Sequence, residues 1–377
     1  MSTIDFIDLQ AQRRRLGPAL EDAIRAVIEG GQYILGPQVG EFEQRLAAFS
    51  GVRHAIGTAN GTDAIVLCLA ALGIKAGDAV LCPAFTFAAT AEAVAWVGAT
   101  PVFVDVDEAT FNIDPDALAG GLDTAKREGL VPRAMIAVDL FGQTADYDAV
   151  ESFCAAHDLT LICDAAQACG ASYKGRRTGS LGTLTTTSFF PAKPLGCYGD
   201  GGAILTDDDA LAALVRSLRS HGQGSQKYDN VRIGLNSRLD TLQAAILLQK
   251  LAIFEDEIEA RQRVAQRYDE ALRDLVATPQ VMRDCVSVWA QYTIRVPAAQ
   301  RESFMAQMRA RGVPTNIYYP KPLTQQQAYK NFPVAGNGVA VSERLAREVV
   351  ALPMHPYLDE ETQDRIIAAA RAVLSEK

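Results

Sequence analysis

Short apolar runs alternate with helical stretches between residues 53 and 220, and this alternation constrains the fold more than any other feature. Runs rich in β-branched or apolar residues predict seven strands: His54–Thr58, Ala79–Pro83, Pro101–Val106, Arg133–Asp139, Leu159–Asp164, Leu184–Phe189 and Ala203–Thr206. Four stretches between them have helical spacing: Asp63–Leu72, Ala91–Val97, Ala145–His157 and Asp207–Arg219. The alternation predicts an α/β fold with a mostly parallel seven-stranded sheet flanked by helices.

The pattern changes after residue 237. Residues 237–274 contain neither Pro nor Gly and predict one long helix between two lobes. Beyond it, VWAQYTIRV predicts a strand, ESFMAQMRARG a helix that ends at Gly312, and GVPTNIYYP a second strand. We therefore expect a large domain over residues 1–240, and a bridging helix with a small C-terminal α/β domain over residues 241–377.

Composition excludes several classes of protein. The net charge of -9, without a basic stripe, argues against a nucleic-acid partner. The longest apolar runs fall short of the ~20 residues that a membrane-spanning helix needs, and the first residues show no secretory signal. Seven scattered cysteines without a CxxC pair, and four histidines without ligand-like spacing, predict reduced thiols and no metal site. We expect a cytoplasmic protein.

Two charged residues suggest chemistry. Asp164 lies at the C-terminal end of a predicted buried strand, where open α/β sheets place ligand contacts, although such an Asp is often a helix cap or turn residue. Lys193 lies in SFFPAKPLG; a loop lysine is usually solvated, but these apolar neighbours would lower its pKa and free the amine for attack. Pyridoxal 5'-phosphate (PLP) needs such a pair, a lysine for its aldehyde and an anion for its pyridine nitrogen.

Three further segments could complete a PLP site. The turn with Gly61 and Thr62 joins a predicted strand to a helix, so its N–H groups predict an anion site, although helix caps of this kind are common. Phe87 could lie flat on the pyridine ring or belong to the core. Gln167 could donate to the cofactor's phenolic oxygen or bond the backbone as a turn amide.

Eight ordered blocks carry a resemblance over nearly the full chain: GQYILGPQVGEFE, ANGTDAIVL, PAFTFAATAEAV, VDLFGQTADYDAV, ICDAAQACGASYKG, SFFPAKPLGCYGDGGAI, RIGLNSRLDTLQAAIL and ALPMHPYL. They resemble the DegT-type sugar-nucleotide aminotransferases of PLP fold type I. The resemblance implies a homodimer with shared active sites. It implies these roles: Lys193 as the Schiff-base lysine, Asp164 at the pyridine nitrogen, Gln167 at the phenolic oxygen, Phe87 on the ring, Gly61, Thr62 and Ser188 at the phosphate, and Asn236 at the phosphate of the other subunit.

The blocks are most similar to enzymes that aminate 3-oxo nucleotide sugars, in particular UDP-2-acetamido-2-deoxy-3-oxo-glucuronate, in lipopolysaccharide O-antigen or other surface-glycan synthesis, with glutamate as the expected amino donor. Arg238 is then the candidate for the sugar carboxylate, and an ordinary ion pair is the alternative. Tyr318 and Tyr319 stand where the family usually has His-Tyr, and both, with His221, are candidate substrate contacts.

Three alternatives stay open or are set aside. A 4-oxo-6-deoxy nucleotide-sugar aminotransferase would use the same cofactor chemistry. A PLP-binding regulatory protein without turnover would keep the Asp164 and Lys193 pair but release no amino group from glutamate. A nicotinamide-binding enzyme is disfavoured, because GTANGTDA is not the GxGxxG pattern.

Overall fold

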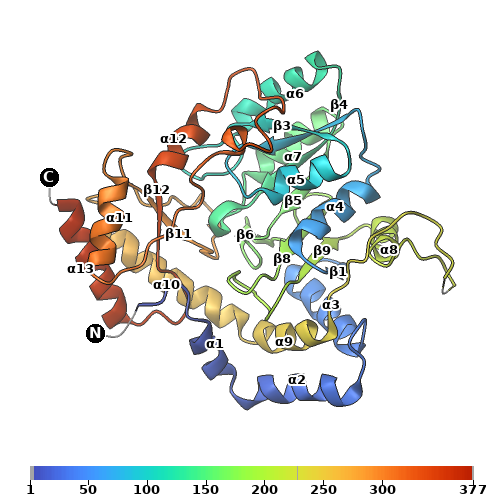
Figure 1. Cartoon of the computed structure of the whole chain (residues 1–377), viewed down its shortest axis with the longest axis horizontal. Coiled ribbons are helices and arrows are strands. Elements are labelled where there is room, and N and C mark those ends of the chain that lie inside the picture. Colours follow the sequence, from blue (N-terminus) through green and yellow to red (C-terminus); the bar gives the residue numbers. More distant parts are fainter. Residues whose placement is uncertain (1–3, 227, 376–377) are drawn as a thin grey trace.

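A computed structural model describes residues 4–226 and 228–375. Its centre is a seven-stranded sheet in the order β1-β9-β8-β5-β4-β2-β3, seen near the middle of Figure 1. Six strands run parallel, and β9 is antiparallel to both of its neighbours. The strands are β1 His54–Thr58, β2 Asp78–Pro83, β3 Thr100–Val104, β4 Val131–Val138, β5 Thr160–Asp164, β8 Leu184–Ser188 and β9 Gly202–Thr206. The predicted α/β fold is confirmed.

Helices cover both faces of the sheet. On one face, α4 (Gly61–Ala71), α5 (Ala89–Trp96) and α8 (Asp209–Leu218) bury their apolar sides against the strands. On the other face, α6 (Leu118–Arg127) and α7 (Tyr147–Ala156) do the same. Side-chain caps fix where several helices begin: Asn60, Asp146 and Asp208 each accept a backbone N–H of the first turn. No described helix is long and apolar enough to cross a bilayer.

The long helix predicted over residues 237–274 is two helices, α9 (Thr241–Leu251) and α10 (Phe254–Leu272). The chain bends at Ala252 and Ile253 because Phe254 is fully buried beside Phe49 and Gly170. Three acidic residues, Glu255 to Glu257, then fill the first turn of α10, where the helix dipole favours negative charge. Packing breaks the helix without Pro or Gly, and the acidic triplet is the only sequence signal of the new start.

The C-terminal part has a smaller sheet than predicted. Strand β11 (Tyr292–Arg295) pairs antiparallel with β12 (Val349–Leu352), and α10, α11 (Arg301–Ala310) and α13 (Glu360–Ser375) pack around them (Figure 1). The predicted strand in GVPTNIYYP is wrong: only Asn316 bridges Ala351, since prolines at 314 and 320 remove ladder donors. The division at residue 240 stays a prediction.

Residues 318–349 return to the large sheet. Phe103 in β3 bonds the backbone at Pro333 and Ala335, and Leu323 N donates to Ala84 O at 2.8 Å. Buried Asp105 accepts the first N–H groups of α12 (Ala340–Glu348). These contacts bring the segment with Tyr318 and Tyr319 to the edge of the sheet where the parallel strands end.

The remaining elements are short or N-terminal. They are α1 Leu9–Leu16, α2 Pro18–Gly30, α3 Pro37–Ser50, β6 Ser172–Tyr173, β7 Arg176–Arg177 and β10 Cys285–Val286, with 3-10 turns at Pro115–Ala117, Leu140–Gly142 and Leu323–Gln325. Helices α2 and α3 pack against α9 below the sheet in Figure 1. This layer backs the turn that carries Lys193.

Candidate active site

The carboxyl ends of the parallel strands meet at one edge of the sheet. Asp164 ends β5, Ser188 ends β8, and the turn with Gly61 follows β1. The loop with Phe87 follows β2 at the same edge. Because open α/β sheets bind ligands beyond these ends, we describe this edge as the candidate active site.

Asp164 is a buried carboxylate, with 5% of its surface exposed. Its Oδ1 accepts the Ala166 N–H at 3.1 Å, and its Oδ2 accepts the Thr90 hydroxyl at 3.4 Å. Burial raises the pKa of Asp164, while the bond from Ala166 and the charge of Lys193 act in the opposite direction. The sequence analysis did not predict a role for Thr90, which lies on α5 shortly after Phe87. Its spacing of four from Thr86, whose hydroxyl it meets, was the signal available in the sequence.

Lys193 lies in a tightly folded turn. Its N–H donates to Phe190 O at 2.8 Å, and the Cys197 N–H donates to Phe189 O at 2.7 Å. Burial lowers the pKa of Lys193 to about 8, and the negative charge of Asp164 partly opposes this shift. The charges of these two groups act on each other, so the amine and the carboxylate lie in the same part of the molecule.

A second lysine holds this turn from behind. Lys250, fully buried in α9, donates to Gly196 O at 2.6 Å and lies 4.3 Å from the centre of the Tyr198 ring. A Cβ at Gly196 would lie 2.4 Å from Pro191 O, so only glycine fits there. Gln243, also in α9, bonds both backbone groups of Tyr198. Helix α9 therefore fixes the position of the Lys193 turn.

Gln167 connects the segment after β4, at Phe141, with the segment that carries Tyr319. Its Oε1 accepts the Phe141 N–H at 2.8 Å, and its Nε2 donates to the Tyr319 hydroxyl at 3.0 Å. The Phe87 and Tyr319 rings lie 6.0 Å apart, and 55% of Phe87 is exposed. Tyr318 is half-buried, with its ring 6.3 Å from Phe6. The structure thus brings Gln167, Phe87 and Tyr319 together beside Asp164.

The turn after β1 lies against the end of β8. Asn60 Oδ1 caps α4 by accepting the Asp63 N–H at 2.8 Å. The N–H groups of Gly61 and Thr62 lie in the first turn of α4, where no carbonyl of the helix can accept them. A Cβ at Gly61 would lie 2.8 Å from Ser188 Cβ. Two N–H groups and the Ser188 hydroxyl therefore converge at the positive end of a helix.

Three predicted residues lie on another segment. His221 is exposed, and its N–H donates to Leu235 O at 2.8 Å. Asn236 is exposed and bridges Ser220. Arg238 is half-buried between two buried neighbours, Ser237 and Leu239. Among the described residues, no hydrogen bond joins His221, Asn236 or Arg238 to Asp164 or Lys193.

Asp139 is a second buried carboxyl beside the site. Its N–H donates to Asp164 O at 3.0 Å, and its Oδ1 accepts from Ala145 N and the Tyr147 hydroxyl, each at 2.9 Å. Its Oδ2 is buried without a partner, and burial raises the pKa of Asp139 to about 8. The side chain bonds Ala145 and Tyr147 at the start of α7, so it holds α7 against the sheet and does not face the candidate active site.

The comparison with known proteins decides the family. A sequence profile of the DegT/DnrJ/EryC1/StrS aminotransferase family matches residues 15–371. The chain belongs to this family. Aminotransferases of this family depend on PLP, so the expected fold, enzyme class and cofactor are confirmed.

Individual members of the DegT/DnrJ/EryC1/StrS family are similar over their whole length. UDP-2-acetamido-2-deoxy-3-oxo-D-glucuronate aminotransferase of Pseudomonas aeruginosa is 48% identical, over 97% of this chain and 99% of the relative. A pleiotropic regulatory protein of Geobacillus stearothermophilus is 41% identical, over 97% and 96%. The crystal structure of a family aminotransferase from Brucella abortus is 50% identical, with a TM-score of 0.97 over 99% of this chain and 100% of that chain.

Proposed function

We propose that this enzyme moves the amino group of glutamate to the 3-oxo carbon of UDP-2-acetamido-2-deoxy-3-oxo-glucuronate, releasing 2-oxoglutarate and a 3-amino sugar. The 48% identity to an enzyme named for this substrate, along nearly the entire chain, carries the proposal. The reaction serves lipopolysaccharide O-antigen or other surface-glycan synthesis, in the cytoplasm. A direct test is mass spectrometry of the product formed with 3-oxo and with 4-oxo nucleotide sugars; amination of only the 4-oxo sugars would contradict it.

The residues at the sheet edge fit PLP. The cofactor, when bound, supplies an aldehyde and a protonated pyridine ring that accepts electrons. Asp164 Oδ2 has only the long bond from Thr90 and could accept the pyridine N–H. Gly61, Thr62 and Ser188 offer donors for the phosphate, Phe87 offers an exposed ring, and the Gln167 amide nitrogen keeps a second hydrogen for the phenolic oxygen.

Lys193 and Asp164 divide the chemical work. The Lys193 amine, neutral in part near pH 8, would hold the cofactor's aldehyde and is the base that could move a proton at the reacting carbon. As a carboxylate, Asp164 would accept the pyridine N–H and so favour the protonated ring. Lys250 and Gln243 keep the Lys193 turn in place while the amine moves.

The lowered pKa of Lys193 predicts how the apoprotein takes up PLP. Only the neutral amine attacks the aldehyde, and its fraction grows about tenfold per pH unit below the pKa. Stopped-flow absorbance should therefore show incorporation that accelerates with pH and levels off above about 8. A rate that is constant from pH 6 to 9 would contradict this role of Lys193.

Gly61→Ala should weaken the phosphate site. The new Cβ would lie 2.8 Å from Ser188 Cβ, so the turn or the end of β8 must shift. We expect the dissociation constant of PLP to rise by about tenfold, since misplaced N–H groups lose part of a charge-assisted interaction. Gly40→Ala, in open space on α3 and without a positive φ, controls for the effect of the methyl group on folding. Equal PLP affinity of both variants would contradict the proposed site.

Arg238 is proposed to bind the sugar carboxylate through its guanidinium fork. Arg238→Ala should raise KM for the 3-oxo glucuronate by about 10- to 100-fold, the value of a charge-assisted hydrogen-bond pair. The matched substrate is the same nucleotide sugar with CH₂OH in place of the carboxylate, for which KM should change little. Equal effects on both substrates would refute the carboxylate role. Tyr318, Tyr319 and His221 are proposed to line the remaining sugar site.

We further propose a homodimer in which Asn236 reaches the phosphate of the partner subunit's site. The exposure of Asn236, and of several large apolar side chains on and near its segment, supports this: Tyr33, Ile34, Leu35, Val231, Ile233 and Leu235. We also propose the division into a large PLP-binding domain over residues 1–240, and a bridging helix with a small C-terminal domain over residues 241–377. Sedimentation of the holoenzyme tests the dimer, and the dissociation constant of PLP for Asn236→Ala, which should rise while the dimer persists, tests the shared site.

A regulatory protein is the second candidate, because one relative carries that name. Such a protein would bind PLP at Lys193 without transferring the amino group. Glutamate added to the holoenzyme separates the two: release of 2-oxoglutarate, with loss of the visible cofactor absorbance, indicates aminotransfer. Absence of both changes would favour the regulatory function.

A further inference from the structure

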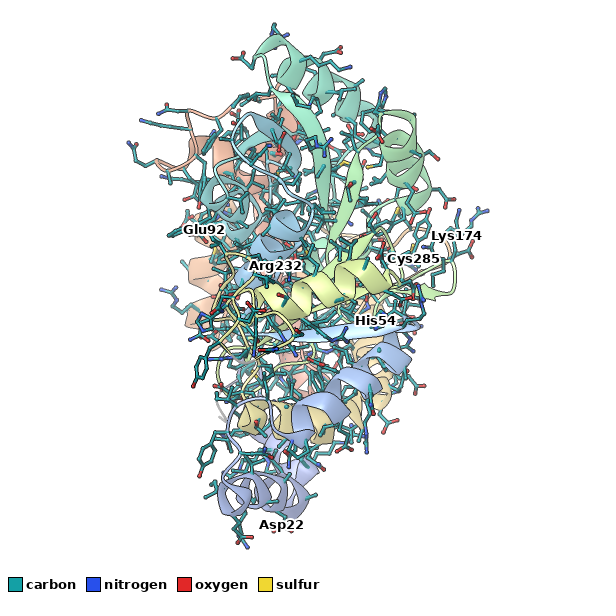
Figure 2. The ribbon with its side chains drawn as sticks, turned by 90° about the vertical axis from the view of Figure 1, so that its right-hand side faces the viewer. Asp22, His54, Glu92, Lys174, Arg232 and Cys285 are labelled. Carbon is teal, nitrogen blue, oxygen red and sulfur yellow. The ribbon has the colours of Figure 1, made fainter. Side chains whose placement is uncertain are left out.

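Within residues 4–226 and 228–375, no strand pairs with the outer edge of β1. β1 stands first in the sheet and pairs only with β9. Figure 2 labels His54 at its start and shows β1 passing between α3 and α8. An open edge leaves backbone N–H and C=O groups unpaired. Here that edge leads within four residues from Gly57 to the turn with Gly61 and Thr62.

Two charged side chains bond the backbone N–H and C=O groups of Gly57 at this edge. Glu43 in α3 accepts the Gly57 N–H at 2.8 Å, and Arg219, just after α8, donates to Gly57 O at 2.8 Å. Arg219 and Glu43 also form an ion pair whose side chains are 9% and 13% exposed. Because both charges are largely removed from water, loss of one leaves the other uncompensated.

Ser237 bonds the next outward-facing backbone N–H, that of Ala59, two residues after Gly57. Its hydroxyl accepts the Ala59 N–H at 3.1 Å, and its own N–H donates to Arg219 O at 2.9 Å. Ser237 is fully buried. A Cβ at Gly57 would lie 2.8 Å from Leu239 Cβ, so glycine at position 57 lets the segment come this close. The three side chains thus replace a missing strand along the edge.

We propose that Glu43, Arg219 and Ser237 are positioning residues for the cofactor phosphate, an inference that rests on the phosphate site of the proposed function. They fix β1 at Gly57 and Ala59, and so set where the Gly61 and Thr62 N–H groups point. Ser237 also follows Asn236 directly in the chain. The same network therefore fixes both phosphate contacts, the one in its own site and the one offered to the partner subunit.

Two probes isolate the phosphate contribution. Pyridoxamine 5'-phosphate has no aldehyde and so forms no covalent bond to Lys193. Pyridoxamine is the same molecule without the phosphate. Equilibrium dialysis of the apoprotein with each probe should show that Glu43→Gln and Ser237→Ala raise the dissociation constant of pyridoxamine 5'-phosphate by about tenfold. The constant for pyridoxamine should stay unchanged. Glu41→Gln is the matched control, since Glu41 lies on the same helix but pairs with Arg45 at the surface.

The outcomes separate the inference from the proposed function. Unchanged affinity for pyridoxamine 5'-phosphate in both variants, or equal weakening of both probes, would overturn the positioning role. If wild-type protein binds the two probes equally, the phosphate site itself is wrong. Should Glu43→Gln fail to fold, Ser237→Ala decides, because it deletes one hydroxyl and leaves the ion pair intact. A changed ³¹P resonance of bound pyridoxamine 5'-phosphate in Ser237→Ala would support the proposal.

Discussion

Lys193→Ala should lower amino transfer from glutamate by about 10⁴-fold or more, because one amine provides both the attachment of the cofactor and the proton transfer at the reacting carbon. Among the described groups that shift the pKa of Asp164, Lys193 carries the one amine. The measurement is the single-turnover rate of 2-oxoglutarate release with saturating glutamate. The protein should still bind pyridoxamine 5'-phosphate, since the phosphate donors are untouched.

Two control variants separate the positive charge of Lys193 from its reactivity as an amine. Lys193→Arg keeps a cation near Asp164 but lacks a nucleophilic amine, and it should be as inactive as the Ala variant. Lys174→Ala removes an exposed lysine that pairs with Asp148, at the surface in Figure 2, and should keep wild-type rates. Activity of Lys193→Ala above one hundredth of wild type would overturn the assignment of the lysine.

Asp164→Asn should lower kcat on the order of 10³-fold, because an amide cannot hold the ring nitrogen in its protonated form. The substitution preserves size, and its side-chain oxygen can still accept the Ala166 N–H. Cofactor binding should therefore survive, which visible absorbance after dialysis checks. Rapid-quench measurement of the glutamate half-reaction then reports the loss of rate.

Asp139→Asn is the matched control for the carboxylate. Asp139 is fully buried and directly follows β4, much as Asp164 is buried at the end of β5, but the partners of Asp139 are Ala145 and Tyr147. Its kcat should stay near the wild-type value. An equal loss in both variants would mean that Asp164 acts on the fold of the sheet edge and not on the cofactor.

Much of the site could be predicted from local sequence. Asp164 at the end of a buried strand, Lys193 in an apolar turn and Gly61 at the start of a helix each have a physical signature within a few residues. The strands were equally predictable, since short β-branched runs bounded by turn residues have few other solutions. What these residues would contact could not be predicted in the same way.

The sequence by itself determined the strand–helix alternation, the mostly parallel sheet and the residue types at the strand ends, because these depend on neighbours along the chain. Only the tertiary structure decided that Phe254 breaks the long helix, that residues 318–349 return to the sheet, and that Tyr319 bonds Gln167. It also decided that Lys250 supports the Lys193 turn and that Glu43 and Arg219 cover the edge of β1. Such contacts join residues far apart in the chain, and burial and charge in the folded core fix them.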